Sequence, residues 1–194
     1  MKYNLSEITE LIKNRRTIYP QFFSSRKVHK EIIEHLLNNA TWAPTHGNTQ
    51  PWRFKVYMEE SRAVLSKNLG ELYKKLTPKE LYIEKKFEKI ISRPFFSSVA
   101  IVVCMERGNN EKIPEIEEVE AVACATQNIC LTATAYGLGS FWSSPKIIYS
   151  QEMNHFLKLK PQDKCLGILY IGYPSIEWPQ GQRKPIEYVT DWNE

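Results

Sequence analysis

The sequence predicts a single α+β domain over residues 1–194, on the strength of two kinds of pattern. Residues 52–58 alternate between apolar and polar side chains, which is typical of a half-buried strand. Ser98–Met105 and Cys165–Gly172 are continuous apolar runs of strand length, which predicts central strands covered on both faces. Helical periodicity occupies segments such as 29–42, and the chain length suits one well-buried core.

Composition excludes several classes of function. Apolar residues make up 42% and charged residues 25%, and no apolar run reaches the roughly 18 residues of a membrane helix. The N-terminus lacks the apolar core of a signal peptide, so we expect a cytoplasmic protein outside the membrane. A net charge of +4 without a basic stripe argues against nucleic-acid binding, and three tryptophans fall in segments predicted to be packed: Trp42, Trp52 and Trp142.

The cysteines predict neither a metal site nor a redox pair. None of them has Cys-x-x-Cys spacing, and all of them lie in apolar segments. Buried, reduced thiols are the expected state of the four: Cys104, Cys124, Cys130 and Cys165.

The first helix is predicted by apolar residues at helical spacing from Leu5 onward, with Ser6 as its N-cap. It runs into the segment Arg15, Arg16 and Thr17. Arginine in a last helical turn is favourable against the helix dipole, and two guanidiniums followed by a hydroxyl also suit an anion. Both interpretations remain open from this segment alone.

A polar loop follows the helix predicted at His29–Trp42. Pro44 and Pro51 bracket it, so the chain cannot be helical across it. Ordinary loops need turn formers but not so dense a set of hydrogen-bonding side chains, so the loop is either a simple connection or a surface for a flat, polar-edged ligand. The side chains concerned are Thr45, His46, Asn48, Thr49 and Gln50.

The middle of the chain predicts two helices. The first covers residues 61–76. Thr77 is then expected to cap a second helix, with Pro78 at its first position, and this helix runs through Ile91 and ends at Arg93-Pro94.

The longest predicted helix covers Glu117–Tyr136 and is small and apolar on nearly every face beyond its first turn. A helix that is apolar all round is buried. In a chain of this length, full burial is most simply achieved against a second copy, so the sequence predicts a homodimer.

The C-terminal third predicts a short strand at Gly139–Trp142, a helix near Gln151–Leu157 and an extended, proline-rich tail. Ser150 is the expected N-cap of that helix. The tail segment 186–189 could add a strand to a sheet edge, either its own or a partner's.

Common catalytic constellations are missing from the sequence. No Gly-x-Gly-x-x-Gly follows a strand, and there is no Walker loop, Gly-x-Ser-x-Gly elbow or clear acid–base pair. The polar segments 15–17, 44–50, 142–144 and 183–184 together fit an aromatic ring with a phosphate tail. Three charge-assisted bonds at about 1.5–3 kcal/mol each approach the roughly 8 kcal/mol of a micromolar site.

Four motifs in order resemble the FMN-dependent nitroreductase family. They are Arg15-Arg16-Thr17 after the first helix, the loop Pro44–Trp52, Gly137-Leu138-Gly139, and Gly172-Tyr173-Pro174 followed by Arg183-Lys184-Pro185. With His46 in this loop, the chain resembles the compact single-domain subgroup of the family. Residues 59–97 resemble the variable cover over the flavin, and no specificity can be deduced from them.

The resemblance implies an α+β fold with a mostly antiparallel central sheet flanked by helices. It further implies an intertwined homodimer with two interfacial sites and C-terminal strand exchange. Arg15, Arg16 and Thr17 would hold the FMN phosphate and ribityl chain, helped by Arg183 and Lys184.

The flavin ring would be held from two subunits. Phe141, Trp142 and Ser143 would line its pyrimidine side. A loop of the other subunit would reach across the dimer with Pro44, Thr45, His46 and Asn48, while Gln50 would bind a ring edge. Contacts near Ser143 and Ser144 differ between relatives.

The resemblance implies an enzyme in which the flavin carries the chemistry and no side chain is catalytic. NADH or NADPH would deliver a hydride to FMN, and a nitroaromatic, a quinone or a similar small electron-poor acceptor would receive it. Other flavin reactions are alternatives, namely dehalogenation, reduction of activated double bonds and flavin fragmentation. A non-enzymatic, anion-binding dimeric scaffold is a further alternative.

Overall fold

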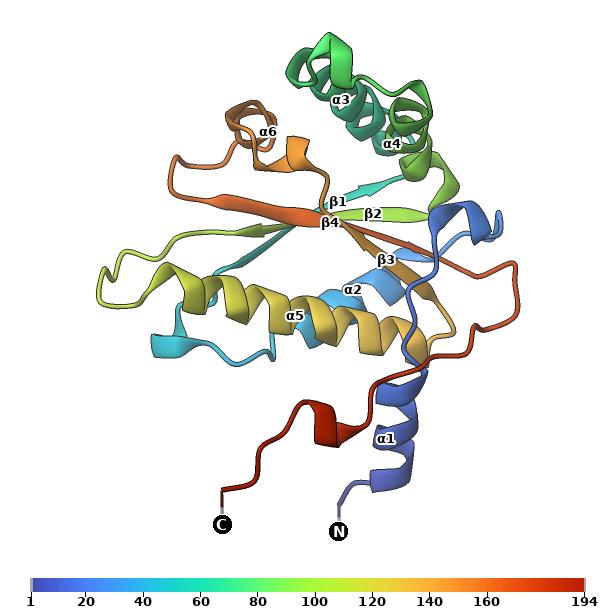
Figure 1. Ribbon diagram of the computed structural model, residues 1–194, viewed down its shortest axis with the longest axis vertical. Helices are drawn as coiled ribbons and strands as arrows, with labels where there is room; N and C mark the ends of the chain where they lie inside the picture. The colour runs from blue at the N-terminus through green and yellow to red at the C-terminus, as the bar shows by residue number, and fades with distance from the viewer. Residues whose placement is uncertain (1, 194) are drawn as a thin grey trace.

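A four-stranded, fully antiparallel sheet forms the centre of the computed structural model, which describes residues 2–193 (Figure 1). Its strand order is β1 (Trp52–Met58), β2 (Val99–Met105), β4 (Lys164–Gly172) and β3 (Gly139–Ser143). The α+β class and the antiparallel sheet are therefore confirmed.

Helices cover both faces of this sheet. On one face lie α2 (Lys30–Ala40) and α5 (Glu115–Ala135), and on the other lie α3 (Ser61–Leu76), α4 (Glu84–Phe96) and α6 (Gln151–Phe156) (Figure 1). This arrangement makes three layers with two hydrophobic cores, one on each side of the sheet.

The central strand β2 shows why its sequence is apolar throughout. Ile101 and Val103 pack into the core under α2 and α5, whereas Ala100 and Val102 pack into the core under α3 and α6. Every residue of β2 is buried, because successive side chains point to opposite, equally covered faces. The edge strand β1 is only half-buried, as its alternating sequence predicts.

The helix α1 (Leu5–Asn14) projects from the body beside the tail that follows β4 (Figure 1). Its N-cap is Asn4 rather than Ser6, because the Asn4 side chain accepts hydrogen bonds from the backbone N–H groups of Ser6 and Glu7. None of its residues is buried in the single chain, although one side of the helix is apolar.

The predicted helix start at Thr77 is wrong. Thr77 is extended and ends α3, a single 3-10 turn covers Lys79–Leu81, and α4 begins only at Glu84. The buried Tyr73 accounts for this difference: its hydroxyl accepts a hydrogen bond from the Ile83 N–H at 3.2 Å and so holds the chain extended just before α4. A long-range contact thus outweighs a local capping signal.

The predicted helix end at Pro94 is also wrong, since α4 continues to Phe96. Proline removes only one hydrogen bond so close to a helix end. Neighbours satisfy the last carbonyls: Ser97 Oγ donates to Arg93 O at 2.8 Å, and Arg62 donates to the carbonyls of Phe95 and Ser97.

The C-terminal half follows the predictions with small shifts. The α5 helix begins at Glu115, two residues early, and α6 has the expected cap, Ser150 Oγ accepting from Met153 N at 3.1 Å. In the single chain α5 has an exposed side that carries Cys124, so its burial against a second copy stays a prediction, whereas the other three cysteines are buried. In the single chain Trp42 is also exposed, at 84%, and lies beyond α2, which ends at Ala40.

The tail segment expected as a strand forms a 3-10 turn, Ile186–Tyr188, and pairs with no strand of its own chain within residues 2–193. Its addition to a partner's sheet stays a prediction. Over the same residues, no helix has the length and apolar character needed to cross a membrane.

Candidate functional site

The segment after α1 lies directly against β3. Thr17 forms a parallel bridge with Ser140, and Ile18 N donates to Ser140 O at 3.0 Å. Burial raises the pKa of the nearby Cys130 thiol, while the Ser140 hydroxyl and the Arg15 charge partly offset that rise. The structure therefore brings Arg15 and Thr17 to the strand whose far end carries the predicted ring-binding residues.

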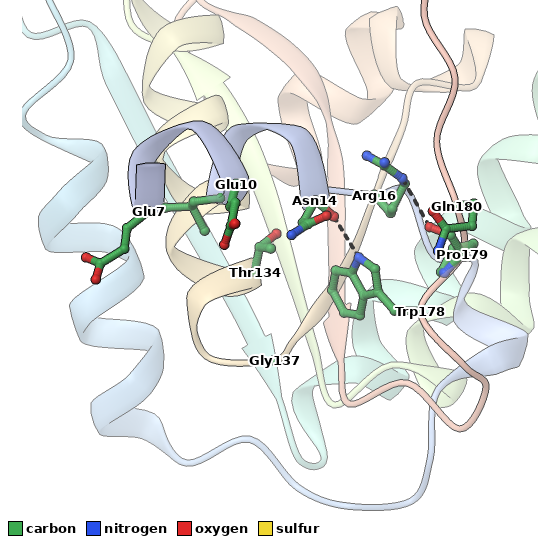
Figure 2. A pocket seen from close by; sticks show the side chains of 10 residues that line it. Glu7, Glu10, Asn14, Arg16, Thr134, Gly137, Trp178, Pro179 and Gln180 are labelled. Atoms are coloured by element: carbon green, nitrogen blue, oxygen red, sulfur yellow. Dashed lines mark hydrogen bonds between the residues drawn. The ribbon is translucent and has the colours of Figure 1, made fainter. Parts of the chain in front are cut away.

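Arg16 binds the C-terminal tail (Figure 2). Its Nε donates to Pro179 O at 3.1 Å, and its Nη1 donates to the carbonyls of Lys13 and Arg15 at 2.5 and 2.7 Å. A cavity of about 590 Å³ lies between α1 and the tail. A second hydrogen bond joins the tail to α1 there, from Trp178 Nε1 to Asn14 O at 2.6 Å. Arg16 thus ties the tail to α1, which differs from the expected joint action with Arg15 on an anion.

This contact holds Gly181 at the end of α1, two residues before the basic pair of the tail. Gly181 packs on the Arg16 guanidinium so closely that a Cβ there would lie 2.1 Å from its Cζ. Arg183 and Lys184 follow within three residues and are exposed, and among residues 2–193 the Arg183 side chain donates to the adjacent Gln182 carbonyl alone, at 2.7 Å. Their phosphate contacts stay a prediction.

The predicted ring-binding residues of β3 lie on two faces, because side chains alternate along a strand. Phe141 lies between Tyr19 and Tyr170, with ring centroids 4.8 and 6.2 Å away. Ser143 shares the same face. Trp142 points to the α5 side, where it is 40% exposed. The three side chains therefore do not form a single ligand surface on this strand.

A residue that sequence reasoning missed completes the Phe141 face. Arg93 on α4 donates from Nη1 to Ser143 Oγ at 3.1 Å, and its guanidinium lies 4.9 Å from the centre of the Phe141 ring. Its sequence context of scattered lysines ending in Arg93-Pro94 indicates only a solvated helix end. No local pattern could have predicted that this side chain of α4 contacts β3.

The loop 44–50 holds an unusual backbone. Asn48 and Gln50 have positive φ angles of 54° and 46°, in addition to Gly47 at 56°. Such conformations cost free energy in non-glycine residues and often mark functional sites. The loop is held by its own side chains: Thr45 Oγ1 pairs with Thr49 Oγ1, and Gln50 Nε2 donates to Asn48 Oδ1, both at 2.9 Å.

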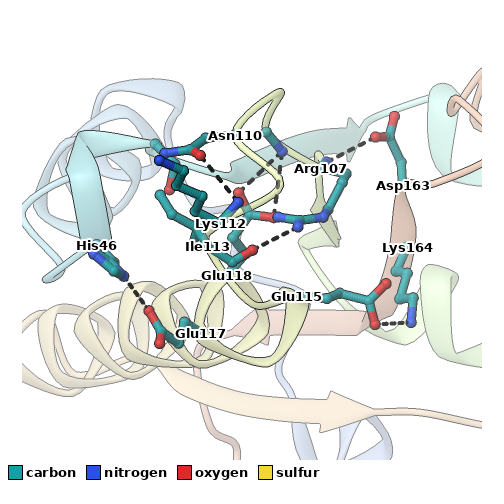
Figure 3. A network of polar contacts seen from close by, with 12 residues as sticks. His46, Arg107, Asn110, Lys112, Ile113, Glu115, Glu117, Glu118, Asp163 and Lys164 are labelled. Atoms are coloured by element: carbon teal, nitrogen blue, oxygen red, sulfur yellow. Dashed lines mark hydrogen bonds and ion pairs between the residues drawn. The ribbon is translucent and has the colours of Figure 1, made fainter.

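Outside contacts anchor this loop to the start of α5 (Figure 3). His46 Nδ1 lies 2.5 Å from Glu117 Oε2, and Gly47 packs against Ile113 so closely that a Cβ would lie 2.9 Å from its Cδ1. Pro44 is exposed, and its contact with the flavin ring of the other subunit stays a prediction.

A buried ion pair lies behind the loop (Figure 3). Arg107 Nη1 is 2.5 Å from Glu118 Oε2, and their side chains are only 15% and 1% exposed. Arg107 Nη2 also donates to Ile113 O at 2.6 Å, and Arg107 N donates to Asp163 Oδ1 at 3.0 Å. Sequence reasoning missed this pair because the two residues, eleven apart, belong to a polar loop and an acidic first helical turn.

The loop and the Arg15 segment lie at different places along α5. The loop contacts Glu117 near the start of the helix, whereas Arg15 lies within electrostatic range of Cys130, thirteen residues later. Thirteen residues correspond to about 20 Å of helix. Within one chain, these two predicted parts of the site therefore do not meet.

An antiparallel sheet between two helical layers, with an Arg-Arg-Thr segment beside its edge strand, defines a nitroreductase-like α+β protein. The model of the Nitroreductase family matches residues 12–173, so the chain belongs to this family. The resemblance deduced from the motifs is thereby confirmed.

Individual relatives cover nearly the whole chain. The Bacillus subtilis protein named Putative NAD(P)H nitroreductase YfhC is 30% identical over 185 residues, covering 93% of this chain and 91% of its own. A nitroreductase-like family protein of Bacillus cereus superposes with a TM-score of 0.82 at 29% identity, over 100% and 98% of the two chains. A Desulfovibrio desulfuricans protein solved with FMN has the same fold, with a TM-score of 0.74, 22% identity and 100% and 99% coverage.

Proposed function

We propose that this protein is a cytoplasmic FMN-dependent oxidoreductase that takes a hydride from NADH or NADPH and reduces a nitroaromatic, a quinone or a similar electron-poor acceptor. The observation that carries the proposal is the position of Arg15 and Thr17 beside Ser140 of β3, the strand that also carries the predicted ring-binding residues. Family membership supports it, as do the NAD(P)H in the name of the Bacillus subtilis relative and the FMN bound to the Desulfovibrio desulfuricans protein.

The donor set of the chain fits FMN. Arg15 and Thr17 would bind the phosphate and ribityl chain, with Arg183 delivered by the tail. Phe141 would pack along the ring, and the amides of Asn48 and Gln50 suit its polar edges. When bound, FMN supplies the hydride acceptor and donor, so the protein's tasks are to bind, orient and shield it.

We further propose that the working form is a homodimer in which each site combines the Arg15 segment of one chain with the loop 44–50 of the other. The separation of about 20 Å along α5 supports this arrangement. The exposed apolar side chains of α1 and the tail support it too, since large exposed apolar patches mark interfaces. They include Leu5, Ile8, Ile12, Ile186, Tyr188, Val189 and Trp192.

The first test is the absorbance spectrum of the purified protein, followed by anaerobic mixing with NADH or NADPH and then with a nitroaromatic. We expect bound FMN, bleaching of its visible absorbance by at least one of the two nucleotides, and recovery of the colour with the acceptor. Colourless protein that takes up no added FMN, or bound flavin that neither nucleotide reduces, would refute the proposal.

The shared site can be tested by subunit complementation. Arg15→Met removes the phosphate cation, and His46→Ala removes a loop residue, so either homodimer has two defective sites. A heterodimer of the two variants, made by co-expression with different tags, has one fully intact site. We expect it to bind about half the FMN of the wild-type dimer; no recovery over the two homodimers would show that the site lies within one chain.

A further inference from the structure

Arg93 is a half-buried cation that faces the same side of β3 as Phe141. Its guanidinium lies 4.9 Å from the Phe141 ring centre and donates to Ser143 Oγ, a side chain that is itself 8% exposed. The proposed function packs Phe141 along the flavin ring, and the family resemblance places Ser143 beside the same ring. Any ring held on this face is therefore within the field of the guanidinium.

Among the described residues, no carboxylate forms an ion pair with Arg93. By contrast, Arg107, which is half-buried like Arg93, is paired with Glu118. A partly buried cation without a counter-charge is unfavourable unless a ligand or an aromatic face supplies negative potential. The Phe141 ring supplies one such face, and the opposite side of the guanidinium has no acidic partner.

Tyr170 is the titratable neighbour of this cluster and cannot act as the counter-ion. Burial raises the pKa of its hydroxyl well above the ordinary value, and the Arg93 charge offsets only part of that rise. The phenol is therefore neutral at physiological pH.

We propose that Arg93 is a cofactor-tuning residue, whose guanidinium supplies the positive charge that stabilises the FMN ring when the ring takes up electrons. This inference rests on the proposed function and extends it, because it assigns a specific electrostatic task to a residue of the otherwise uninterpreted segment 59–97. A cation near the ring favours its electron-rich, reduced form over its oxidised form, so it raises the reduction potential of the flavin.

Two substitutions separate the charge of Arg93 from its hydrogen bond. Arg93→Gln keeps a donor for Ser143 but removes the charge, whereas Arg93→Lys keeps the charge. Arg26→Gln is the matched control, because the Arg26 guanidinium also lies over an aromatic ring, that of Tyr173, at 3.8 Å. The measurements are the FMN dissociation constant of each variant and its midpoint potential, determined by anaerobic equilibration with a reference dye.

We expect Arg93→Gln to lower the equilibrium constant for flavin reduction at least tenfold, which is a fall of about 30 mV for a two-electron couple. Arg93→Lys should restore most of this loss, and Arg26→Gln should leave the potential unchanged. An Arg93→Gln potential equal to wild type, or an equal fall in the glutamine and lysine variants, would overturn the inference while the proposed function stands. Wild-type protein that takes up no FMN would overturn both.

Discussion

Breaking the buried pair between Arg107 and Glu118 should cost more stability than any exposed ion pair of the chain. Arg107→Met removes the guanidinium and leaves a carboxylate that is 1% exposed. The Gly108 N–H, at 3.1 Å, is then its remaining hydrogen-bond donor. The free energy of unfolding should fall, because an isolated buried charge has neither water nor a partner to stabilise it.

The structure sets the expected magnitude. Removing one partner of a buried ion pair costs about 3–5 kcal/mol. In a domain of this size each kcal/mol lowers the melting temperature by about 2–4 °C, so the expected fall is roughly 6–20 °C. Glu118→Gln should cost less, about 1.5–3 kcal/mol, since Arg107 stays bonded to the Ile113 carbonyl and is closer to solvent.

Urea unfolding of FMN-free protein, followed by tryptophan fluorescence at one fixed protein concentration, measures these losses. The double variant Arg107→Met/Glu118→Gln should lose about 1–3 kcal/mol less than the sum of the single variants, because neither charge is left alone. Lys30→Met is the control: it breaks the exposed pair with Glu34 at 3.4 Å and should change stability by under about 1 kcal/mol. An Arg107→Met loss no larger than that of the control, or strictly additive losses, would refute the reasoning.

Three further changes test other parts of the structure. A lysine contact lowers the pKa of the Glu106 carboxyl, so its stabilisation is present above the ordinary glutamate range and is lost as pH falls through the lowered value. Glu106→Gln should therefore cost up to about 1 kcal/mol at pH 7 and nothing in strong acid. Gly167→Ala places a Cβ 2.1 Å from Trp142 Nε1 and should shift the Trp142 near-UV circular dichroism, whereas Gly137→Ala, with no atom within 4 Å, should not. Arg16→Met should release the tail and speed tryptic cleavage after its basic pair.

Each of these expectations has a contrary outcome. A Glu106→Gln loss that persists unchanged at low pH would mean that charge is not its cause. A Gly167→Ala spectrum identical to wild type would show that the Trp142 ring has room to move. Equal cleavage rates in Arg16→Met and in Lys13→Met, a control on the exposed part of α1, would show that Arg16 does not hold the tail.

Local patterns predicted the elements whose environment is uniform along their length. The apolar runs at 98–105 and 165–172 are strands because both faces of the sheet are covered, and Ser150 caps its helix through a bond to its own next turn. Failures occurred where distant groups compete with local signals. Tyr73 delays the start of α4 by binding the Ile83 N–H, and Arg62 lets α4 continue past Pro94 by donating to a backbone carbonyl of its last turn.

The sequence by itself determined the class of domain, its strands and its family, since hydrophobic periodicity and ordered motifs are properties of neighbouring residues. Only the tertiary structure decided which polar groups meet: Arg16 with the tail, Arg107 with Glu118, and Arg93 with Ser143. Each of these contacts joins residues from different elements. Charge and hydrogen-bonding capacity can be deduced from one residue type, but the partner depends on how the chain packs.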